Sequence, residues 1–360
     1  MNYSNFYLLL VALFGTVLSG CVGSSTSSTE LPGEEPKLVF RLSNELKPDS
    51  YVWEVSNIFK NELEKESPDG SVKAGEIKVV FYDQGMIGGE RQLLESCFFD
   101  VIEMVQVNSS VLTTLDPAFS ILDLPYLFLD EDQHTEVLYG EIGGNMLGRL
   151  EKYNLCGLGF YSTGFRNLFY KSSKDHSDIK SPSDLSGLKI RVMESPIMIS
   201  SVNSIGPTAT PIPFSELFQS IKTGVVDGAE NCAPIFMSYK YTEAGCNQFT
   251  LTEHFANQHM IIANKKWFDG LDEKYRKRIR EAVAVAQNEF GKIWNKTLDD
   301  AYAAMGSEGV NINHVKDKTP FVEMSGSVIE SFRKKYPEES AQFLDKIIEV
   351  RSRTEKENEV

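Results

Sequence analysis

The sequence predicts an α/β fold with a mostly parallel sheet, divided into two domains. Strand-like and helix-like segments alternate from residue 37 to 107, and a second alternating series begins near residue 162. A strand–helix–strand order is typical of parallel sheets, because the helix carries the chain back to the edge where the strand began. The chain has 360 residues, more than the ~250–300 at which a single hydrophobic core stops growing. Its 41% apolar and 24% charged residues are typical of a soluble globular protein.

In the first series, short apolar runs give the strands and apolar residues at helical spacing give the helices. Val52, Val55, Phe59 and Leu63 fall on one face of a helix that Asp49 or Ser50 would cap. The predicted order is strand 37–42, helix 50–66, strand 76–82, helix 90–99 and strand 101–107. The glycines at 85, 88 and 89 predict a tight turn before the second helix, because their spacing does not fit a phosphate-binding loop.

The second series follows a helical stretch at 131–153 and a buried strand at 155–161. Its predicted elements are strand 166–171, a turn at 182–187, strand 188–192, helix 197–205, extended chain at 208–212, a helix from 215 to 222 that stops at Gly224, a helix near 234–243 and extended chain at 249–263. The periodic segment 272–305 lacks proline and would form a helix of about 34 residues, ~50 Å long. A helix of this length is expected to connect both domains, and the charged tail at 351–360 is expected to be solvated.

The first 36 residues predict export. Residues 6–18 form an apolar run that is too short to span a bilayer, which takes ~20 residues, but that fits the core of a signal peptide at 1–20. Cys21 follows Val17-Leu18-Ser19-Gly20, which resembles a bacterial lipobox whose cysteine is lipidated. The alternative is an ordinary secretory signal with a chance cysteine, since no Lys or Arg precedes the apolar run. Residues 21–36 predict a flexible tether, so we expect an extracytoplasmic protein with a lipid anchor in the bacterial membrane.

Four cysteines follow the tether, namely Cys97, Cys156, Cys232 and Cys246. None is part of a CxxC pair, which argues against structural zinc. A disulfide is compatible with an extracytoplasmic location, and Cys232 with Cys246 is the closest pair in sequence. Buried free thiols are the favoured alternative.

Charge and motifs exclude several classes of function. Acidic residues outnumber basic ones by 51 to 36, which gives a net charge of −15 and argues against a nucleic-acid binder. The sequence has no HExxH, GxSxG, phosphate-loop or dinucleotide-binding pattern. His254 and His259 are the only histidines close in sequence, and an offset of five in extended chain places them on opposite faces. We therefore expect no enzyme, no metal and no cofactor; Asp227 and Glu230 are interpreted as solvated or capping carboxylates.

Two arginines have the pattern of anion-binding residues. In the strand LKIRV, Leu188, Ile190 and Val192 face one way, and Lys189 and Arg191 face the other. Arg191 lies next to the strand's carboxyl end, where open α/β sheets bind ligands, and a guanidinium matches a carboxylate with two parallel hydrogen bonds. An exposed strand arginine is the alternative. Arg166 lies among apolar residues and needs an anion, which is either an internal Asp or Glu or a ligand.

Three motifs then carry a resemblance to a known family. They are LPYLF at 124–128, DLSGLKIRV at 184–192 and GPTATPIPFSELFQSIKTGVVDGAEN at 206–231. In this order they resemble the substrate-binding proteins of tripartite ATP-independent periplasmic (TRAP) transporters, of the C4-dicarboxylate-binding type. The resemblance covers nearly the whole chain after the tether.

The resemblance implies a two-lobed periplasmic-binding-protein fold, type II-like, with a long helix spanning both lobes. Lobe I would comprise 37–161 plus about 252–285, and lobe II 162–251 plus about 286–350. It implies a protein without enzymatic activity that captures an organic acid in a cleft between the lobes and delivers it to a TRAP membrane permease. Relatives bind dicarboxylates, sugar acids, keto acids and sialic acids, so the particular acid stays open.

The resemblance also implies roles for five residues. Arg191 matches the carboxylate-binding arginine, and Arg166 a second arginine that lies near the cleft and helps closure. Asn231 matches an amide that contacts the carboxylate or a neighbouring hydroxyl, and Phe214 an aromatic that packs on the ligand. Asn108 falls at a variable position that would tune specificity.

Ser43 and Asn44 are weaker candidates of the same kind as Asn108. The sequence departs from the family pattern at Ala229, where Gln is usual, and at Cys232, where Pro is usual. Both positions flank Asn231.

Two other functions remain open at this point: a solute-binding lipoprotein of an ATP-driven importer, or one that serves a sensory system.

Overall fold

The computed structural model describes residues 35–82, 85–172, 176 and 178–358. The signal peptide, Cys21 and nearly all of the tether lie outside these residues. The part from Glu35 onward is one compact unit.

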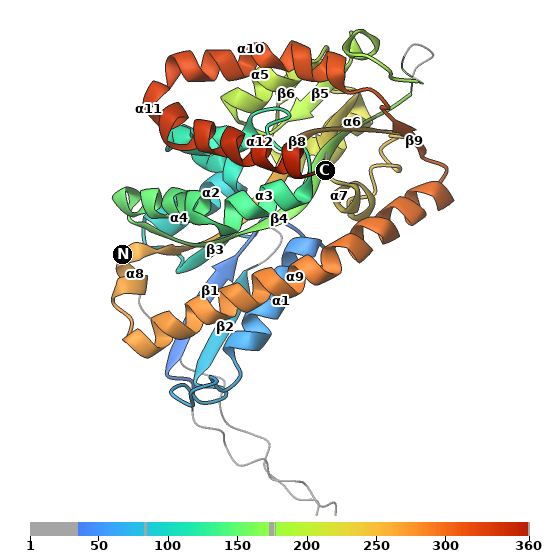
Figure 1. The fold of residues 1–360 in the computed structure, drawn as a ribbon. Helices are drawn as coiled ribbons and strands as arrows, with labels where there is room; N and C mark the ends of the chain where they lie inside the picture. Colours follow the sequence, from blue (N-terminus) through green and yellow to red (C-terminus); the bar gives the residue numbers. More distant parts are fainter. Residues whose placement is uncertain (1–34, 83–84, 173–175, 177, 359–360) are drawn as a thin grey trace, which may run out of the picture. The chain divides into compact units, whose positions relative to one another are not determined.

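A single mixed sheet of nine strands organises the described residues (Figure 1). Its order is β2-β1-β3-β8-β4-β7-β5-β6, and β9 pairs with β8. The strands are β1 (Leu38–Ser43), β2 (Ile77–Tyr82), β3 (Met104–Asn108), β4 (Leu155–Tyr170), β5 (Lys189–Val192), β6 (Thr208–Pro211), β7 (Gly228–Asn231), β8 (Gln248–Asn264) and β9 (Asn311–His314). This confirms the α/β class.

Each end of the sheet is parallel, as the alternating segments predict. At one end β1 pairs in parallel with β2 and β3, and at the other β5 pairs in parallel with β6 and β7. The helices α1 (Tyr51–Leu63) and α2 (Glu90–Phe98) connect the first three strands, and α5 (Pro196–Ser204) and α6 (Leu217–Thr223) connect the others. The carboxyl ends of parallel strands meet at one edge, which is where ligands bind in open α/β sheets.

Two long strands join these ends, and here the predicted boundaries were wrong. We expected separate strands at 155–161 and 166–171, but β4 is continuous through both and pairs antiparallel with β8. The register shifts between Ser162 and Phe165, where Gly164 has a φ of 68°. A β-bulge with a glycine in the left-handed region bends a strand without ending it, so the polar interruption in the sequence is a bulge and not a loop.

The predicted long helix is α9 (Glu273–Ser307), of 35 residues. It contacts α1 and β4, and also α7 (Ala233–Ser238) and β9 (Figure 1). It therefore bridges the first and second series, as expected for a helix that connects two lobes.

The remaining helices depart further from the sequence prediction. The stretch 131–153 breaks into α3 (Glu131–Tyr139), α4 (Glu141–Gly148) and a 3-10 turn at Arg149–Tyr153, because glycines at 140, 143 and 144 weaken a continuous helix. Two 3-10 segments, Ser109–Thr114 and Pro117–Asp123, and the short α8 (Lys265–Asp269) were not predicted.

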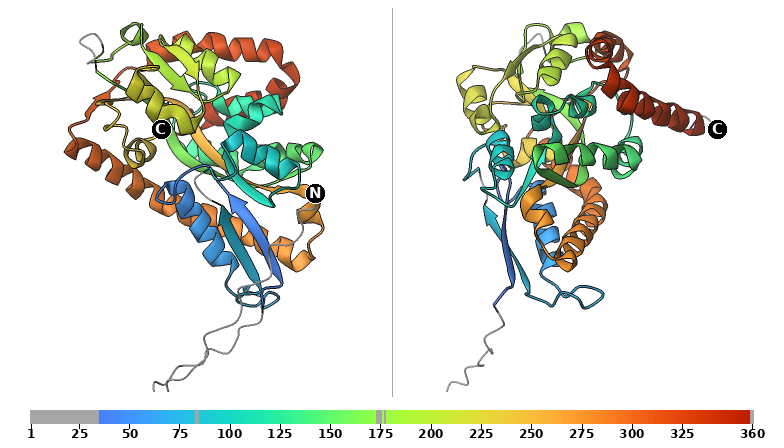
Figure 2. Two further views of the ribbon diagram at one scale, coloured as in Figure 1. Left: turned by 180° about the vertical axis from the view of Figure 1, so that it is seen from behind. Right: turned by 90° about the vertical axis from the view of Figure 1, so that its left-hand side faces the viewer.

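The C-terminal region is helical, and its last helix overlaps the predicted charged tail at 351–360. It contains α10 (Thr319–Lys335), the single turn α11 (Pro337–Glu339) and α12 (Asp345–Asn358), which Figure 2 shows in red. Arg351 donates a hydrogen bond to the carbonyl of Tyr126 at 2.9 Å, and Arg353 pairs with Glu136 on α3. Arg351 and Arg353 thus connect α12 to the rest of the protein, while Ser352 and Arg353 remain exposed; the helical form of this segment was not predicted.

At Gly228, β7 packs so closely on β4 that a larger residue would not fit. A Cβ at Gly228 would lie 2.6 Å from the Cα of Tyr170 and would also collide with the carbonyl oxygen of Phe169. Because backbone atoms cannot yield as a flexible side chain does, we expect Gly228→Ala to lower the unfolding free energy by about 2–4 kcal/mol. Urea unfolding measures the change. Gly144→Ala is the control, since nothing lies within 4 Å of its Cβ position; equal stability of the two variants would contradict the observed strand pairing.

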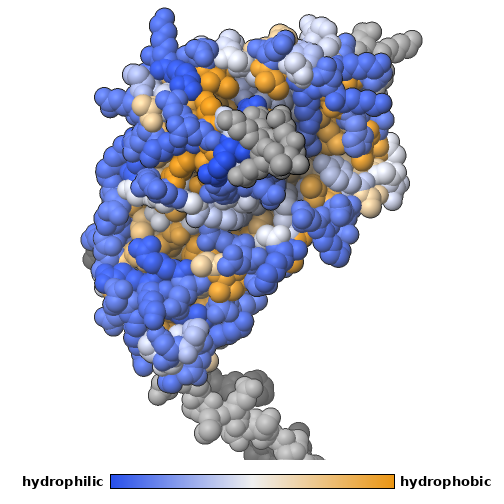
Figure 3. Space-filling model, in the orientation of Figure 1, coloured by the Kyte–Doolittle hydropathy of each residue, from blue (hydrophilic) through white to orange (hydrophobic). Residues whose placement is uncertain are grey.

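The face of the protein in Figure 3 is mainly hydrophilic, and the four described cysteines are unpaired. Hydrophilic side chains cover most of the face shown in Figure 3, with apolar side chains visible between them. None of the described helices is both long and apolar enough to cross a membrane. Cys97, Cys156, Cys232 and Cys246 are all buried free thiols, which confirms the favoured alternative.

Candidate ligand-binding site

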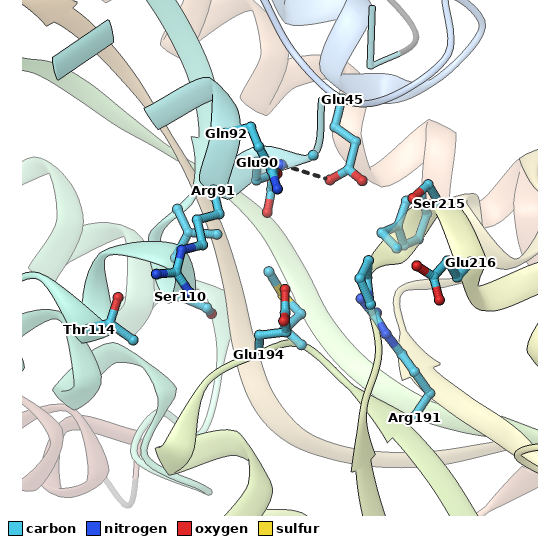
Figure 4. A pocket seen from close by; sticks show the side chains of 15 residues that line it. Glu45, Glu90, Arg91, Gln92, Ser110, Thr114, Arg191, Glu194, Ser215 and Glu216 are labelled. Atoms are coloured by element: carbon cyan, nitrogen blue, oxygen red, sulfur yellow. Dashed lines mark hydrogen bonds between the residues drawn. The ribbon is translucent and has the colours of Figure 1, made fainter. Parts of the chain in front are cut away.

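A cavity of about 240 Å³ lies where loops from the two ends of the sheet meet (Figure 4). One wall comes from the loop after β1, from the start of α2 and from the 3-10 turn at Ser109–Thr114. The other comes from β5 with the loop after it and from the segment Pro213–Glu216. A second cavity of about 30 Å³ shares Glu45, Glu90, Arg191, Met193 and Phe214 with it. The two together form one hollow at the carboxyl ends of β1, β3, β5 and β7.

Arg191 is a buried cation without a carboxylate partner among the described residues. It is 2% exposed, and its Nε donates to the carbonyl of Ile212 at 2.7 Å. Its Nη1 is buried and has no hydrogen-bond partner in the described part of the chain. The guanidinium carbon lies 5.7 Å from the centre of the Phe214 ring. A buried guanidinium with an open donor is costly unless an anion binds it, so this arrangement favours an anionic ligand.

Arg166 has its anion inside the protein. Its Nε and Nη2 donate to the two carboxylate oxygens of Glu230, the second at 2.9 Å, and its Nη1 donates to Asn257 at 2.9 Å. Glu230 raises the pKa of Arg166 above its ordinary value, against the effect of burial. Arg166 also lines the smaller cavity. Of the two partners left open by the sequence, an internal carboxylate is therefore the one observed.

This pairing corrects the interpretation of Glu230 as a solvated or capping residue. Glu230 is fully buried, at 0% exposed. Its partner is 64 residues away in sequence, on the neighbouring strand β4. The Asp227 carboxylate accepts a hydrogen bond from the main-chain N–H of Lys189, the first residue of β5, at 2.7 Å.

The three other predicted residues lie around the smaller cavity with the two arginines. Asn108 ends β3, and its amide donates to Asn257 at 2.8 Å and accepts from the N–H of Ser110 at 3.0 Å. Asn231 ends β7, and its side-chain oxygen accepts from the N–H of Cys232 at 2.8 Å. Phe214 packs edge-on against Tyr239 with 4.8 Å between ring centres. All five predicted residues thus lie at one place, although they come from five segments of the chain.

Sequence reasoning missed Glu45 and Glu90, which line both cavities. It considered Ser43 and Asn44 instead, but these line neither. Ser43 donates to the carbonyl of Tyr82 at 2.5 Å, and the Asn44 oxygen accepts from the N–H of Leu46 at 3.0 Å. The signal that could have found Glu90 is the turn at residues 85–89, which positions the start of α2 at the cavity.

The described residues show neither a metal-ligand cluster nor a charged histidine at the site. They contain no group of three His, Cys, Asp or Glu residues that could hold a metal ion. Burial lowers the pKa of His254 and of His259 to about 3, with Arg166 adding to the effect, so neither imidazole is charged near neutral pH.

Asp123, which lies near the site, should make the unfolding free energy of the protein depend on pH. Its carboxyl is 3% exposed and accepts from Ser110 Oγ at 2.7 Å and Ser195 Oγ at 3.4 Å. Burial raises its pKa from 3.8 to about 7; the charge of Glu230 adds to this, and Arg166 and the serine hydrogen bonds oppose it.

Because the folded protein holds this proton more tightly than the unfolded chain, Asp123 stabilises the fold below pH 4. That stability is lost as the pH rises to about 7. Relative to Asp123→Asn, we expect the unfolding free energy of the protein to fall by about 1.4 kcal/mol per pH unit over this window. Urea unfolding of both proteins between pH 4 and 8.5 measures it. A difference that stays constant with pH would contradict the raised pKa.

The fold and the site together define a class of protein. A mixed sheet with two parallel ends joined by long antiparallel strands, a bridging helix and a cavity at the strand ends is the two-lobed architecture of periplasmic solute-binding proteins. The chain belongs to family 7 of the bacterial extracellular solute-binding proteins, whose model matches residues 42–335. It is therefore an extracellular binding protein and not an enzyme.

Known relatives support this assignment over most of the chain. A solute-binding protein of Chromohalobacter salexigens is 30% identical over 73% of this chain and 77% of its own length. The C4-dicarboxylate-binding periplasmic protein DctP of Rhodobacter capsulatus is 27% identical over 83% of this chain and 87% of its own. The crystal structure of a TRAP periplasmic solute-binding protein from Chromohalobacter salexigens with bound D-glucuronate superimposes with a TM-score of 0.79 at 27% identity, covering 87% of this chain and 99% of that one. These relatives identify the TRAP type and do not favour an ATP-driven importer.

Proposed function

We propose that this protein captures an organic acid in the cavity at the strand ends and that Arg191 receives the ligand's carboxylate. The observation that carries the proposal is the buried Arg191, whose Nη1 has no partner among the described residues. A carboxylate would supply the missing acceptor through two parallel hydrogen bonds. The relatives agree with an acid, since one binds D-glucuronate and another is a C4-dicarboxylate-binding protein.

The other four residues take supporting roles in this proposal. Phe214 covers the ligand and the Arg191 guanidinium, and Asn231 contacts the carboxylate or a neighbouring hydroxyl. Asn108 contacts the part of the ligand farther from the carboxylate. Arg166 is already neutralised by Glu230, so it positions Asn257 and the strand ends and contributes less charge to the ligand than Arg191 does.

Closure of two lobes would bury the acid. Lobe I would comprise 37–161 plus about 252–285, and lobe II 162–251 plus about 286–350, with β4 and β8 as the crossing strands. Hinge closure of this kind is common among binding proteins. The closed form would then deliver its ligand to a TRAP membrane permease.

A lipid on Cys21 would hold the protein at the membrane surface. We expect mass spectrometry of the protein from a bacterial host to show a diacylglyceryl group on Cys21 after loss of residues 1–20. Cys21→Ser should release the protein into the soluble fraction. An unmodified Cys21 in a cleaved, soluble protein would support the secretory alternative instead.

The test of the ligand class is a thermal-shift screen of the full chain against carboxylates and neutral sugars. A ligand at ~100 times its dissociation constant adds ~2.7 kcal/mol of stability, which raises the melting temperature by several degrees. We expect shifts from organic acids only. A shift with a neutral sugar and with no acid would contradict the proposal.

A further inference from the structure

The walls of the larger cavity carry more negative than positive charge. Glu45, Glu90, Glu194 and Glu216 all line it, against Arg191 and Arg91. Arg91 is exposed, and its Nε bonds to Glu95 at 3.2 Å. Arg191 is therefore the single buried cation of this cavity, and a ligand with one negative charge is enough to satisfy it.

Glu45 and Glu90 form a pair across from Arg191. Figure 4 shows both side chains entering the cavity from one side and the Arg191 guanidinium from the other, with the main-chain N–H of Glu90 donating to Glu45 Oε2 at 3.3 Å. Glu90 Oε1 also accepts from the N–H of Asn108 at 2.7 Å, and its side chain is 12% exposed. Each carboxyl keeps oxygens that can accept a hydrogen bond from a ligand.

Among the described residues no arginine or lysine is hydrogen-bonded to this pair as Arg166 is to Glu230, although the charge of Arg191 opposes the effect of burial on the pKa of Glu45. The closest basic atom to Glu90 is Nε2 of His259 at 3.9 Å, and that imidazole is neutral because burial lowers its pKa to about 3. Burial, and next the charge of Glu45, raises the pKa of Glu90 to about 8; the more distant Arg166 and Arg191 act in the opposite direction. The pKa values of both carboxyls are therefore raised before a ligand binds, which shows that the site disfavours further negative charge at this place.

From this arrangement we infer that the cavity selects acids with a single carboxylate and several hydroxyl groups, and that Glu45 and Glu90 reject a second carboxylate. The inference rests on the proposed role of Arg191 as the carboxylate receptor. With that end fixed, the rest of the ligand faces the Glu45–Glu90 pair. A hydroxyl can donate to these oxygens. A second carboxylate would add a negative charge beside two carboxyls that already disfavour being charged together, and the repulsion is greatest above the pKa of Glu90, about 8. The relatives leave both ligand types open, and the acidic wall favours the sugar acid over the dicarboxylate.

Matched ligands test this directly by isothermal titration calorimetry of the full chain at pH 9, above the pKa of Glu90, where its carboxyl is ionised. D-Gluconate and D-glucarate differ in one terminal group, a hydroxymethyl against a carboxylate, and D-galactonate and galactarate form a second such pair. Succinate carries two carboxylates without hydroxyls. We expect at least one aldonate to bind ~10-fold or more tightly than its own aldarate, and succinate to bind more weakly than that aldonate.

Variants identify the residues responsible. Glu45→Gln and Glu90→Gln remove charge at nearly constant shape, so each should reduce the preference for aldonate over aldarate by ~3-fold or more. Glu54→Gln on α1 is the control: it removes an exposed carboxylate that lines neither cavity, and should leave the ratio unchanged. Thermal melts confirm that each variant is folded.

The failure of this inference is distinct from the failure of the proposed function. If succinate or an aldarate binds as tightly as the aldonates, and Arg191→Ala abolishes that binding, the proposed function stands and the inference is wrong. An aldonate preference that persists in both Gln variants would also overturn it. If neither these acids nor any carboxylate of the thermal-shift screen binds, the proposed function itself is contradicted.

Discussion

Replacing Arg191 with alanine is expected to weaken binding of the organic acid by ~2–5 kcal/mol, or ~30- to 5,000-fold. Arg191 is 2% exposed and is the single buried cation of the larger cavity, so no other group there can replace its charge. Calorimetric titration of the variant and the unchanged protein measures the loss. Arg191→Lys should restore part of the affinity, since an ammonium keeps the charge but not the two parallel hydrogen bonds.

Two controls keep this result interpretable. Lys189 lies on the same strand and face but is exposed, so Lys189→Ala should bind with unchanged affinity. Arg191→Ala should also remain folded, because it removes one hydrogen bond to Ile212 together with a costly buried charge. A folded Arg191→Ala variant that binds the acid normally would show that the carboxylate is received elsewhere.

Replacing Glu230 with alanine is expected to be among the most destabilising changes in the protein, at about 3–5 kcal/mol. The substitution leaves the Arg166 guanidinium, itself 4% exposed, without its carboxylate in a buried site. Urea unfolding measures the loss. The effect arises from the isolated charge more than from the lost contact, so the cost should depend on whether Arg166 is present.

A double substitution separates these two contributions. Glu230→Met combined with Arg166→Met removes both charges, and should be more stable than the single variant Glu230→Met, because apolar residues of similar volume often replace a buried ion pair at little cost. Additive losses in the two single variants would contradict a direct pairing of the two side chains.

Much of the fold follows from local patterns that one sequence displays. Alternation in LKIRV predicted that Ile190 and Arg191 face opposite sides of a strand, and the apolar period of 272–305 predicted α9 within two residues at each end. These features depend on neighbours in sequence. The continuity of β4 does not, because a polar, glycine-containing stretch is compatible with either a loop or a bulge, and only the pairing with β8 decides between them.

For the site too, residues within sequence motifs could be predicted, whereas contacts between residues far apart in sequence could not. Arg191, Phe214 and Asn231 come from motifs with a family resemblance, and all five predicted residues lie together, although their roles stay predictions. The partner of Glu230 could not be predicted because it is 64 residues away in sequence. Without its neighbours, a carboxylate on a short strand is most simply interpreted as solvated. Glu45 was missed because it lies in the loop after β1, where the sequence does not indicate which side chain turns inward; for Glu90 the only local signal is the turn at 85–89.

The central claim is that Arg191 recognises the ligand's carboxylate, and a comparison of one acid with its uncharged analogue tests it most directly. The measurement is a calorimetric titration of the best-binding aldonate and of the alditol with the same stereochemistry, into the unchanged protein and into Arg191→Ala. We predict that the unchanged protein binds the aldonate at least ~100-fold more tightly, and that the variant loses this preference. An alditol that binds as well as the aldonate, or a preference that survives in the variant, would contradict the account.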